Sequence, residues 1–198
     1  MAALVTEMDS QATDLLTNAS KLLHDEGPQA LTVRKIAASA GWSTMGVYSR
    51  FGSKNGVVDA LYLEGIERIE RDLNGVSRLG NPAAVLRQTI VTYRDTAIAH
   101  SSHYQLVFGG VVADFTPTTA SRAVTARVFA AFKETVASAV NSGEIAATKT
   151  EDLAYSLWAL SHGLITLEIS APPGIKKDDF SRRYQVAIDF MITGMARG

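Results

Sequence analysis

The segment between Gly27 and Lys54 carries hydroxyl groups and cations but no acid. Side chains of these two kinds donate hydrogen bonds to phosphate oxygens. The wider segment from Ser20 to Gly56 contains five cations and two anions, although the whole 198-residue chain has a net charge of −1. This imbalance favours contact between the front of the protein and a polyanion such as nucleic acid.

Two short helices are expected to position these side chains. Thr32 is a predicted cap for a helix over 33–40, because its hydroxyl can accept a hydrogen bond from an amide of the first turn. Gly41 can then adopt the left-handed conformation that ends the helix. A second helix begins at Ser43 or Thr44 and runs to about residue 51. Two helices joined by so short a turn form a helix-turn-helix, whose second helix enters the major groove of DNA.

The outward face of the second helix follows from its apolar spacing. Val47 and Phe51 are four residues apart and point inward, so Thr44, Met45 and Tyr48 share the outward face. A thymine methyl group can meet a methyl group or a thioether, and Thr44 and Met45 are therefore predicted to contact base edges. The predicted phosphate contacts are Thr32, Ser43, Tyr48, Arg34, Arg50 and Lys54. The alternative is a structural helical hairpin with a basic rim.

The rest of the chain predicts an all-α fold of about nine helices, because apolar residues recur at intervals of three and four and no strand alternation is sustained. The remaining helices are predicted over residues 10–26, 54–79, 82–97, 118–142, 149–170 and 178–196, with Ser53, Asn81 and Thr118 as caps and a less regular segment over 100–115. We divide the chain into a DNA-binding domain over 1–56 and a ligand-binding and dimerisation domain over 57–198.

The N-terminal segment resembles the TetR family of transcriptional regulators over about fifty residues. The resemblance rests on Thr32-Val33-Arg34, Ile36-Ala37, Ala40-Gly41, Ser43, Tyr48, Phe51 and Gly52-Ser53-Lys54. It implies a homodimer that binds palindromic double-stranded DNA and holds a small molecule in its helical remainder. The predicted DNA-binding residues are Thr32, Val33, Arg34, Ser43, Thr44, Met45, Tyr48, Arg50 and Lys54. The sequence departs from the family at Trp42, in place of a small aliphatic residue, and at Thr44, where a lysine is common.

The segment 157–170 is similar to a subgroup of the family with a Trp-x-x-x-His-Gly element, here Trp158, His162 and Gly163. Its helix is apolar nearly all round, so it must be buried on two sides, and we expect one side to face a second chain. A larger monomeric bundle is the alternative. The predicted dimer interface consists of Leu157, Leu164, Ile165, Phe180, Tyr184, Ile188 and Met191.

Aromatic side chains of the central helices are candidates for a ligand pocket, because pockets between helices are mostly apolar. The predicted ligand-binding residues are Tyr93, Tyr104, Phe108, Phe129, Trp158 and His162. No buried-looking acid or base accompanies them, which predicts a small apolar effector. His162 has a second interpretation, in which its ring satisfies only a neighbouring carbonyl.

The composition excludes several other classes of protein. There is no cysteine and there are four scattered histidines, so we expect no metal, no cofactor and no disulfide. No apolar run is long enough to span a bilayer and the start of the chain does not resemble a signal peptide, which predicts a cytoplasmic protein without a membrane partner.

The sequence thus predicts a ligand-responsive regulator, in which an effector releases a repressor from its operator. A regulator controlled by a protein partner is an alternative. A remote one is a helical enzyme that uses His162 with Glu168, or His100 with His103, although no catalytic motif is present.

Overall fold

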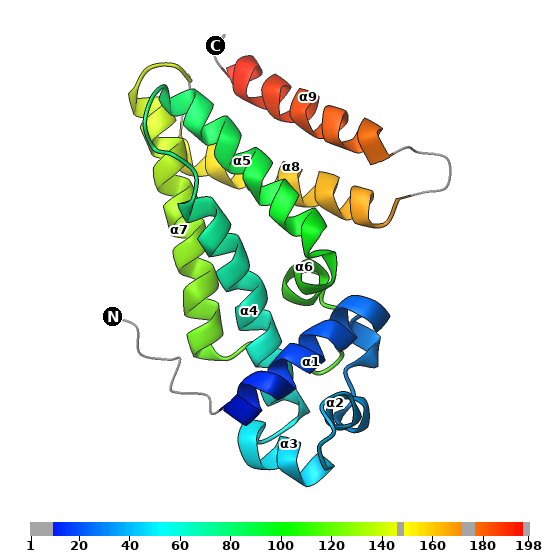
Figure 1. Ribbon diagram of the computed structural model, residues 1–198. Coiled ribbons are helices and arrows are strands. Elements are labelled where there is room, and N and C mark those ends of the chain that lie inside the picture. Colours follow the sequence, from blue (N-terminus) through cyan, green and yellow to red (C-terminus); the bar gives the residue numbers. More distant parts are fainter. Residues whose placement is uncertain (1–9, 146–148, 172–176, 196–198) are drawn as a thin grey trace. The chain divides into compact units, whose positions relative to one another are not determined.

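The computed structural model describes residues 10–145, 149–171 and 177–195. These residues form nine α-helices and one short 3₁₀ turn, with no strand among them. In chain order the elements are α1 (Ser10–Glu26), η1 (Pro28–Ala30), α2 (Val33–Ser39), α3 (Thr44–Phe51), α4 (Lys54–Asn74), α5 (Pro82–Ala99), α6 (Ser101–Phe108), α7 (Thr119–Asn141), α8 (Thr150–Ile169) and α9 (Lys177–Met195) (Figure 1). The all-α prediction is confirmed.

The chain divides into two compact units. Unit 1 consists of residues 1–67 and 100–124, and unit 2 consists of residues 68–99 and 125–198. The helices α4 and α7 each begin in unit 1 and end in unit 2. The sequence instead suggested a division at residue 56 between a DNA-binding segment and a ligand-binding segment. That division is one of function, and it stays a prediction.

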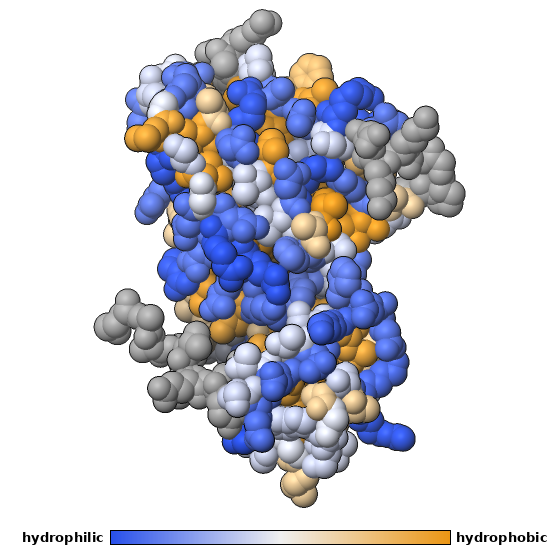
Figure 2. Space-filling view, in the orientation of Figure 1, coloured by the Kyte–Doolittle hydropathy of each residue, from blue (hydrophilic) through white to orange (hydrophobic). Residues whose placement is uncertain are grey.

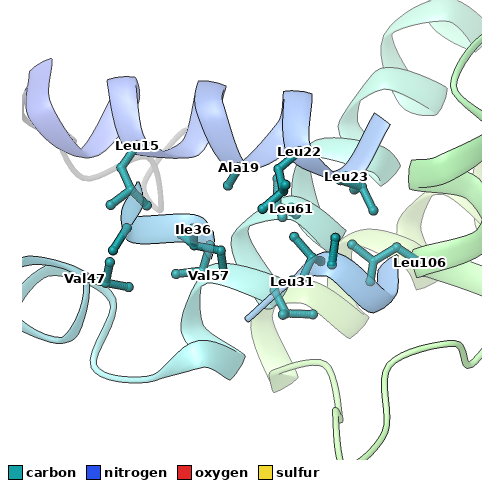
Figure 3. Packing of buried hydrophobic residues seen from close by; sticks show 13 residues of the cluster. Leu15, Ala19, Leu22, Leu23, Leu31, Ile36, Val47, Val57, Leu61 and Leu106 are labelled. Atoms are coloured by element: carbon teal, nitrogen blue, oxygen red, sulfur yellow. The ribbon is translucent and has the colours of Figure 1, made fainter. Parts of the chain in front are cut away.

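A continuous apolar core holds unit 1 together. One face of α1 supplies Leu15, Ala19, Leu22 and Leu23, all of which are buried. Figure 3 shows these side chains directed toward Leu31, which follows η1, and toward residues of α2, α3, α4 and α6, namely Ile36, Val47, Val57, Leu61 and Leu106. Short helices such as α2 and α3 are marginal alone, so this shared core is what keeps them helical.

Unit 2 is built around α8, which packs against both α5 and α9. A buried ion pair joins two of these helices. The guanidinium of Arg94 on α5 donates to both carboxylate oxygens of Glu168 on α8, at 2.6 and 2.9 Å. The Tyr184 hydroxyl of α9 donates to the carbonyl of Ile90. These bonds satisfy polar groups that would be costly to bury alone.

The predicted helix caps are confirmed because capping is a local property. Backbone amides of the first turns donate to the side chains of Thr32, Ser43, Ser53, Asn81 and Thr118.

Two helix predictions were wrong. The helix predicted to reach residue 79 ends at Asn74, where Gly75 follows, and the segment predicted to be irregular contains α6. The helix predicted to end at residue 196 is described to Met195. No helix of the described residues is both long and apolar enough to cross a membrane.

Candidate nucleic-acid interface

The turn between α2 and α3 has the geometry that the helix-turn-helix requires. Gly41 has a φ of +69°, in the left-handed region. The amide of Gly41 donates to the carbonyl of Ala38, and the amide of Trp42 donates to the carbonyl of Ala37 at 2.8 Å. These are the two hydrogen bonds of a Schellman motif, which satisfies the last carbonyls of α2 and redirects the chain.

Trp42 closes this turn by packing on α3. Its indole ring lies 2.9 Å from the point where a Cβ on Gly46 would stand, which is closer than two carbon atoms normally approach. The ring also packs against the core of unit 1. Because Gly46 has no side chain, the indole fits against the backbone of α3 and sets the position of its first turn.

The outward face of α3 is exposed as predicted. Val47 is fully buried, whereas Met45 is 74% exposed and Tyr48 is 48% exposed. In the space-filling view the surface over α3 is mostly pale, which marks residues of intermediate hydropathy in contrast to the blue charged regions (Figure 2). A solvated helix face more often carries glutamate and lysine. The exposed face of α3 therefore differs from an ordinary solvated helix face.

The predicted phosphate-contacting residues surround this face. Thr32, Arg34 and Ser43 are exposed, and Lys54 is half-buried. The Ser43 hydroxyl oxygen accepts from the amide of Gly46, so its own proton remains to be donated. Val33 differs from the others, since it is half-buried and packs against the core of unit 1.

Two of the cations in this segment already have partners within unit 1. Arg50 donates to the amide oxygen of Gln11 on α1 at 2.9 Å, which directs its guanidinium toward α1. Lys35 pairs with Glu26 at the exposed surface. Exposed pairs of this kind are weak, so a phosphate can replace the carboxylate at small cost.

Four of the six predicted ligand-binding residues gather in unit 2. Trp158 lies beside Phe129 and His162, with ring centroids 5.3 and 4.5 Å apart. The His162 Nε2 atom lies 3.0 Å from the Tyr93 hydroxyl, in a hydrogen bond. Burial lowers the pKa of His162 to about 4, so the ring is neutral at pH 7.

The other two residues, Tyr104 and Phe108, belong to α6 in unit 1, where their rings lie 5.1 Å apart. The predicted set thus falls into two groups, and none of the six residues lines a hollow that the structure shows in unit 2. That hollow is open to solvent and lies between α4, α5 and α7. It is lined by Glu70, Leu73, Asn74, Arg78, Thr89, Val128, Ala131, Phe132 and Thr135.

The lining of this hollow is more polar than the apolar pocket that the sequence suggested. Arg78 donates to the hydroxyl of Thr135 across it. A hydrogen bond from Arg127 lowers the pKa of Glu70 and keeps this carboxylate charged. Nothing in the spacing of these polar residues signalled a shared site, because they come from α4, the loop after it, α5 and the more distant α7.

The residues predicted for a dimer interface differ in how far they are buried within unit 2. Leu157, Ile165, Tyr184 and Ile188 are buried inside unit 2, so they offer no surface to a second chain. Leu164, Phe180 and Met191 are half-buried. The large apolar side chains that α8 and α9 expose are instead Tyr155, Leu167, Val186 and Phe190. Both faces of α8 are apolar, so the sequence pattern could not distinguish its buried residues from its exposed ones.

Neither acid–base pair of the enzyme alternative forms. Glu168 is bound by Arg94, and His162 is bonded to Tyr93. The rings of His100 and His103 have centroids 6.5 Å apart, and Nε2 of His103 faces both the Ser20 hydroxyl and a Glu64 carboxylate oxygen. Because serine and acid approach the same nitrogen, the ring cannot pass a proton between them as a catalytic triad does. Within the described residues, no cluster of three potential metal ligands was found.

Comparison with known proteins places this architecture in a family. Residues 15–61 match the family of bacterial regulatory proteins described as the tetR family. Residues 86–191, more than half of the chain, match the tetracyclin repressor-like C-terminal domain. No curated protein matched the chain by sequence similarity.

Solved structures show the same fold at low sequence identity. A protein from Rhodococcus sp. RHA1 described as having unknown function has a TM-score of 0.80 at 22% identity, over 98% of this chain and 100% of that one. The TetR family transcriptional regulator PfmR from Thermus thermophilus has a TM-score of 0.72 at 15% identity, over 90% and 97%. AibR, solved in complex with isovaleryl coenzyme A and operator DNA, has a TM-score of 0.69 at 17% identity, over 89% and 97%. With both family domains matched in the expected order, the chain belongs to the TetR family of transcriptional regulators.

Proposed function

We propose that this protein is a homodimeric repressor that binds a palindromic operator through α2 and α3 and is released from it by a small molecule. The observation that carries the proposal is the exposed face of α3, which presents Met45 and Tyr48 in a segment without acids. Thr32, Arg34, Ser43 and Lys54 would hold the phosphates on either side and set the register of α3 in the major groove.

The dimer follows from the apolar surface of α8 and α9. Tyr155, Leu167, Val186 and Phe190 are exposed on these two helices, and the resemblance to the TetR family implies a homodimer. A two-fold axis would bring α8 and α9 of one chain against the same two helices of the other and give a four-helix interface. A palindromic operator offers its two half-sites on successive major grooves, about 34 Å apart, one for each copy of α3.

Release by a small molecule requires the effector to bind one spacing of the two DNA-binding units more tightly than another. A tenfold loss of operator affinity needs only about 1.4 kcal/mol of differential binding. The hollow between α4, α5 and α7 supports an effector site in unit 2, because it offers Phe132 and Val128 beside Arg78 and Glu70. Such a lining favours an effector with an apolar body and a polar end.

An effector site at the hollow can be tested by filling it. Compounds are first screened for release of a labelled operator. The variant Ala131→Phe should keep operator affinity but lose the response, since Ala131 lines the hollow. Ala130→Phe, at the exposed neighbouring position, is the matched control. Equal responses in both variants would place the effector elsewhere. An absence of any active compound, together with a captured protein that releases DNA, would favour control by a protein partner.

The DNA-binding function is tested by selecting bound duplexes from a random pool at near-physiological salt. The variant Tyr48→Phe with Lys54→Ala serves as the control. A single palindrome with half-sites about one helical turn or more apart is expected. If mass spectrometry finds no small molecule in the denatured protein and no sequence is enriched over the control, the proposal is wrong.

A further inference from the structure

We propose that α3 recognises its half-site through the methyl groups of thymine, so that A·T pairs lie beneath its first turn. The inference rests on the proposed function, since it takes α3 to be the helix in the major groove. It names the class of base pair that this protein selects and the residue that selects it, Met45.

The exposed residues of α3 define what the helix can bind. Thr44 and Met45 stand in the first turn, followed by Tyr48 and Ser49, and all four are exposed. Tyr48 lies four residues after Thr44 and three after Met45, so the three side chains form one continuous surface. Met45, at 74% exposed, is the most solvent-accessible of the large apolar residues that the structure describes in unit 1. Its position at the centre of this surface gives it direct access to base edges.

Base edges in the major groove differ in the chemistry that recognises them. Guanine is bound by the paired donors of arginine or lysine, cytosine by a carboxylate, and adenine by a carboxamide. Thr44, Met45, Tyr48 and Ser49 contain none of these groups. They offer a threonine methyl group, a thioether, a phenol and hydroxyl groups. Hydroxyl groups bond to several bases, whereas apolar contact selects thymine by its methyl group. The side chains on this face therefore discriminate chiefly in favour of thymine.

Arg50 is the one cation of α3 and it does not share this face. It lies five residues after Met45, which turns it by about 140° around the helix axis. Its guanidinium donates to Gln11 of α1, on that other side. A guanine contact from α3 would need this arginine to leave Gln11 and reach around the helix. Arg50 is better placed to meet a phosphate at the edge of the groove.

The electrostatics agree with this division of roles. Between Gly27 and Val58 the chain has four cations and no anion, which suits the phosphate backbone. None of these cations is among Thr44, Met45 and Tyr48, and the surface over α3 is pale in Figure 2. Phosphate binding thus supplies affinity around the rim, and the uncharged centre is left to read the bases.

The test replaces thymine by uracil, which lacks only the methyl group. Each thymine of the selected operator half-site is replaced in turn, and affinity is measured by fluorescence anisotropy at fixed salt. At one or two positions per half-site, uracil should weaken binding about fourfold, which is about 0.8 kcal/mol for one buried methyl group. Met45→Ala should bind the thymine and uracil duplexes equally at the position that Met45 contacts. Because Met45 is exposed, this variant should retain the wild-type melting temperature.

Lys54→Ala is the matched control. It should weaken binding to thymine and uracil duplexes by the same factor, because a phosphate contact does not sense the base. An operator with a G·C core and no thymine beneath α3, or wild-type affinity unchanged by uracil at every position, would overturn the inference while leaving the proposed function intact. A uracil penalty that persists in Met45→Ala would overturn the assignment to Met45. Selection of no sequence by a protein that mass spectrometry shows to be free of small molecules would mean that the proposed function itself has failed.

Discussion

The indole of Trp42 occupies the space where a side chain on Gly46 would begin, 2.9 Å from the Cβ position. Both residues lie in the segment predicted to bind DNA, yet neither is a predicted contact. Their packing joins the turn to the first turn of α3. The location of Ser43 and Met45 therefore depends on Trp42, which stands where the family usually has a small aliphatic residue.

This packing predicts opposite effects of one substitution in two backgrounds. Gly46→Ala should destabilise the wild-type protein, because overpacking costs about 1–3 kcal/mol and outweighs the helix preference of alanine, about 1 kcal/mol. With Trp42→Val the space is open, and Gly46→Ala should stabilise by roughly 0.5–1 kcal/mol. Chemical denaturation measures both effects. The same sign in both backgrounds would show that the indole does not constrain α3.

The buried ion pair of unit 2 should matter far more than an exposed one. The side chains of Arg94 and Glu168 are 10% and 9% exposed. Arg94→Met leaves a buried carboxylate without its partner and should cost about 3–5 kcal/mol of unfolding free energy. Lys35→Met, which breaks the exposed pair with Glu26, should cost less than about 1 kcal/mol. If the two losses are similar, the Arg94–Glu168 pair is not buried in solution.

His162 should make the protein less stable in mild acid. Burial lowers its pKa from the ordinary value of 6.5 to about 4, so the unfolded chain binds the proton more readily. The free energy of unfolding is therefore highest above pH 6.5 and falls as the pH drops toward 4. Near pH 5, unfolding should take up about one more proton at this site. In His162→Gln, which keeps an acceptor for Tyr93, the fall between about pH 7 and pH 5 should be shallower. Equal slopes in the two proteins would contradict the buried neutral ring.

Phosphate contacts should appear in the salt dependence of operator binding. Arg34→Ala and Lys54→Ala should each lower the slope of log K against log salt by about one per contact, or two per dimer. Arg71→Ala removes an exposed cation of α4 within unit 2 and should leave the slope unchanged. The slope is measured between about 50 and 200 mM salt, the range over which such contacts are lost. A slope that shifts equally in all three variants would reflect net charge alone.

Dimerisation should depend on the exposed face of α9. Phe190 is 75% exposed, and Phe190→Glu should yield a folded monomer with weak operator binding. Gln185→Glu makes the same change in charge about 140° away on the helix and should leave the dimer intact. Light scattering at micromolar concentration measures both. A dimeric Phe190→Glu protein would exclude this face from the interface.

Features that depend on neighbours along the chain could be predicted from the sequence. Helix bounds such as Ser10–Glu26 follow from apolar spacing, and the caps at Thr32, Ser43 and Thr118 follow from a hydroxyl three residues before an amide. The exposed face of α3 was predictable for the same reason, since Val47 fixes which side of one short helix turns inward. Family membership was recognisable because its motif lies within one continuous segment.

Contacts between residues far apart in the chain were decided only by the three-dimensional packing. The helix α6 has no side-chain cap, and its burial of His103, Tyr104 and Leu106 against other elements is what makes it helical. In α8 both faces are apolar, so packing with α5 and α9 alone determined that Leu157 is buried and Leu167 exposed. The partner of Glu168 likewise lies 74 residues away, at Arg94, a pairing that no local pattern could predict.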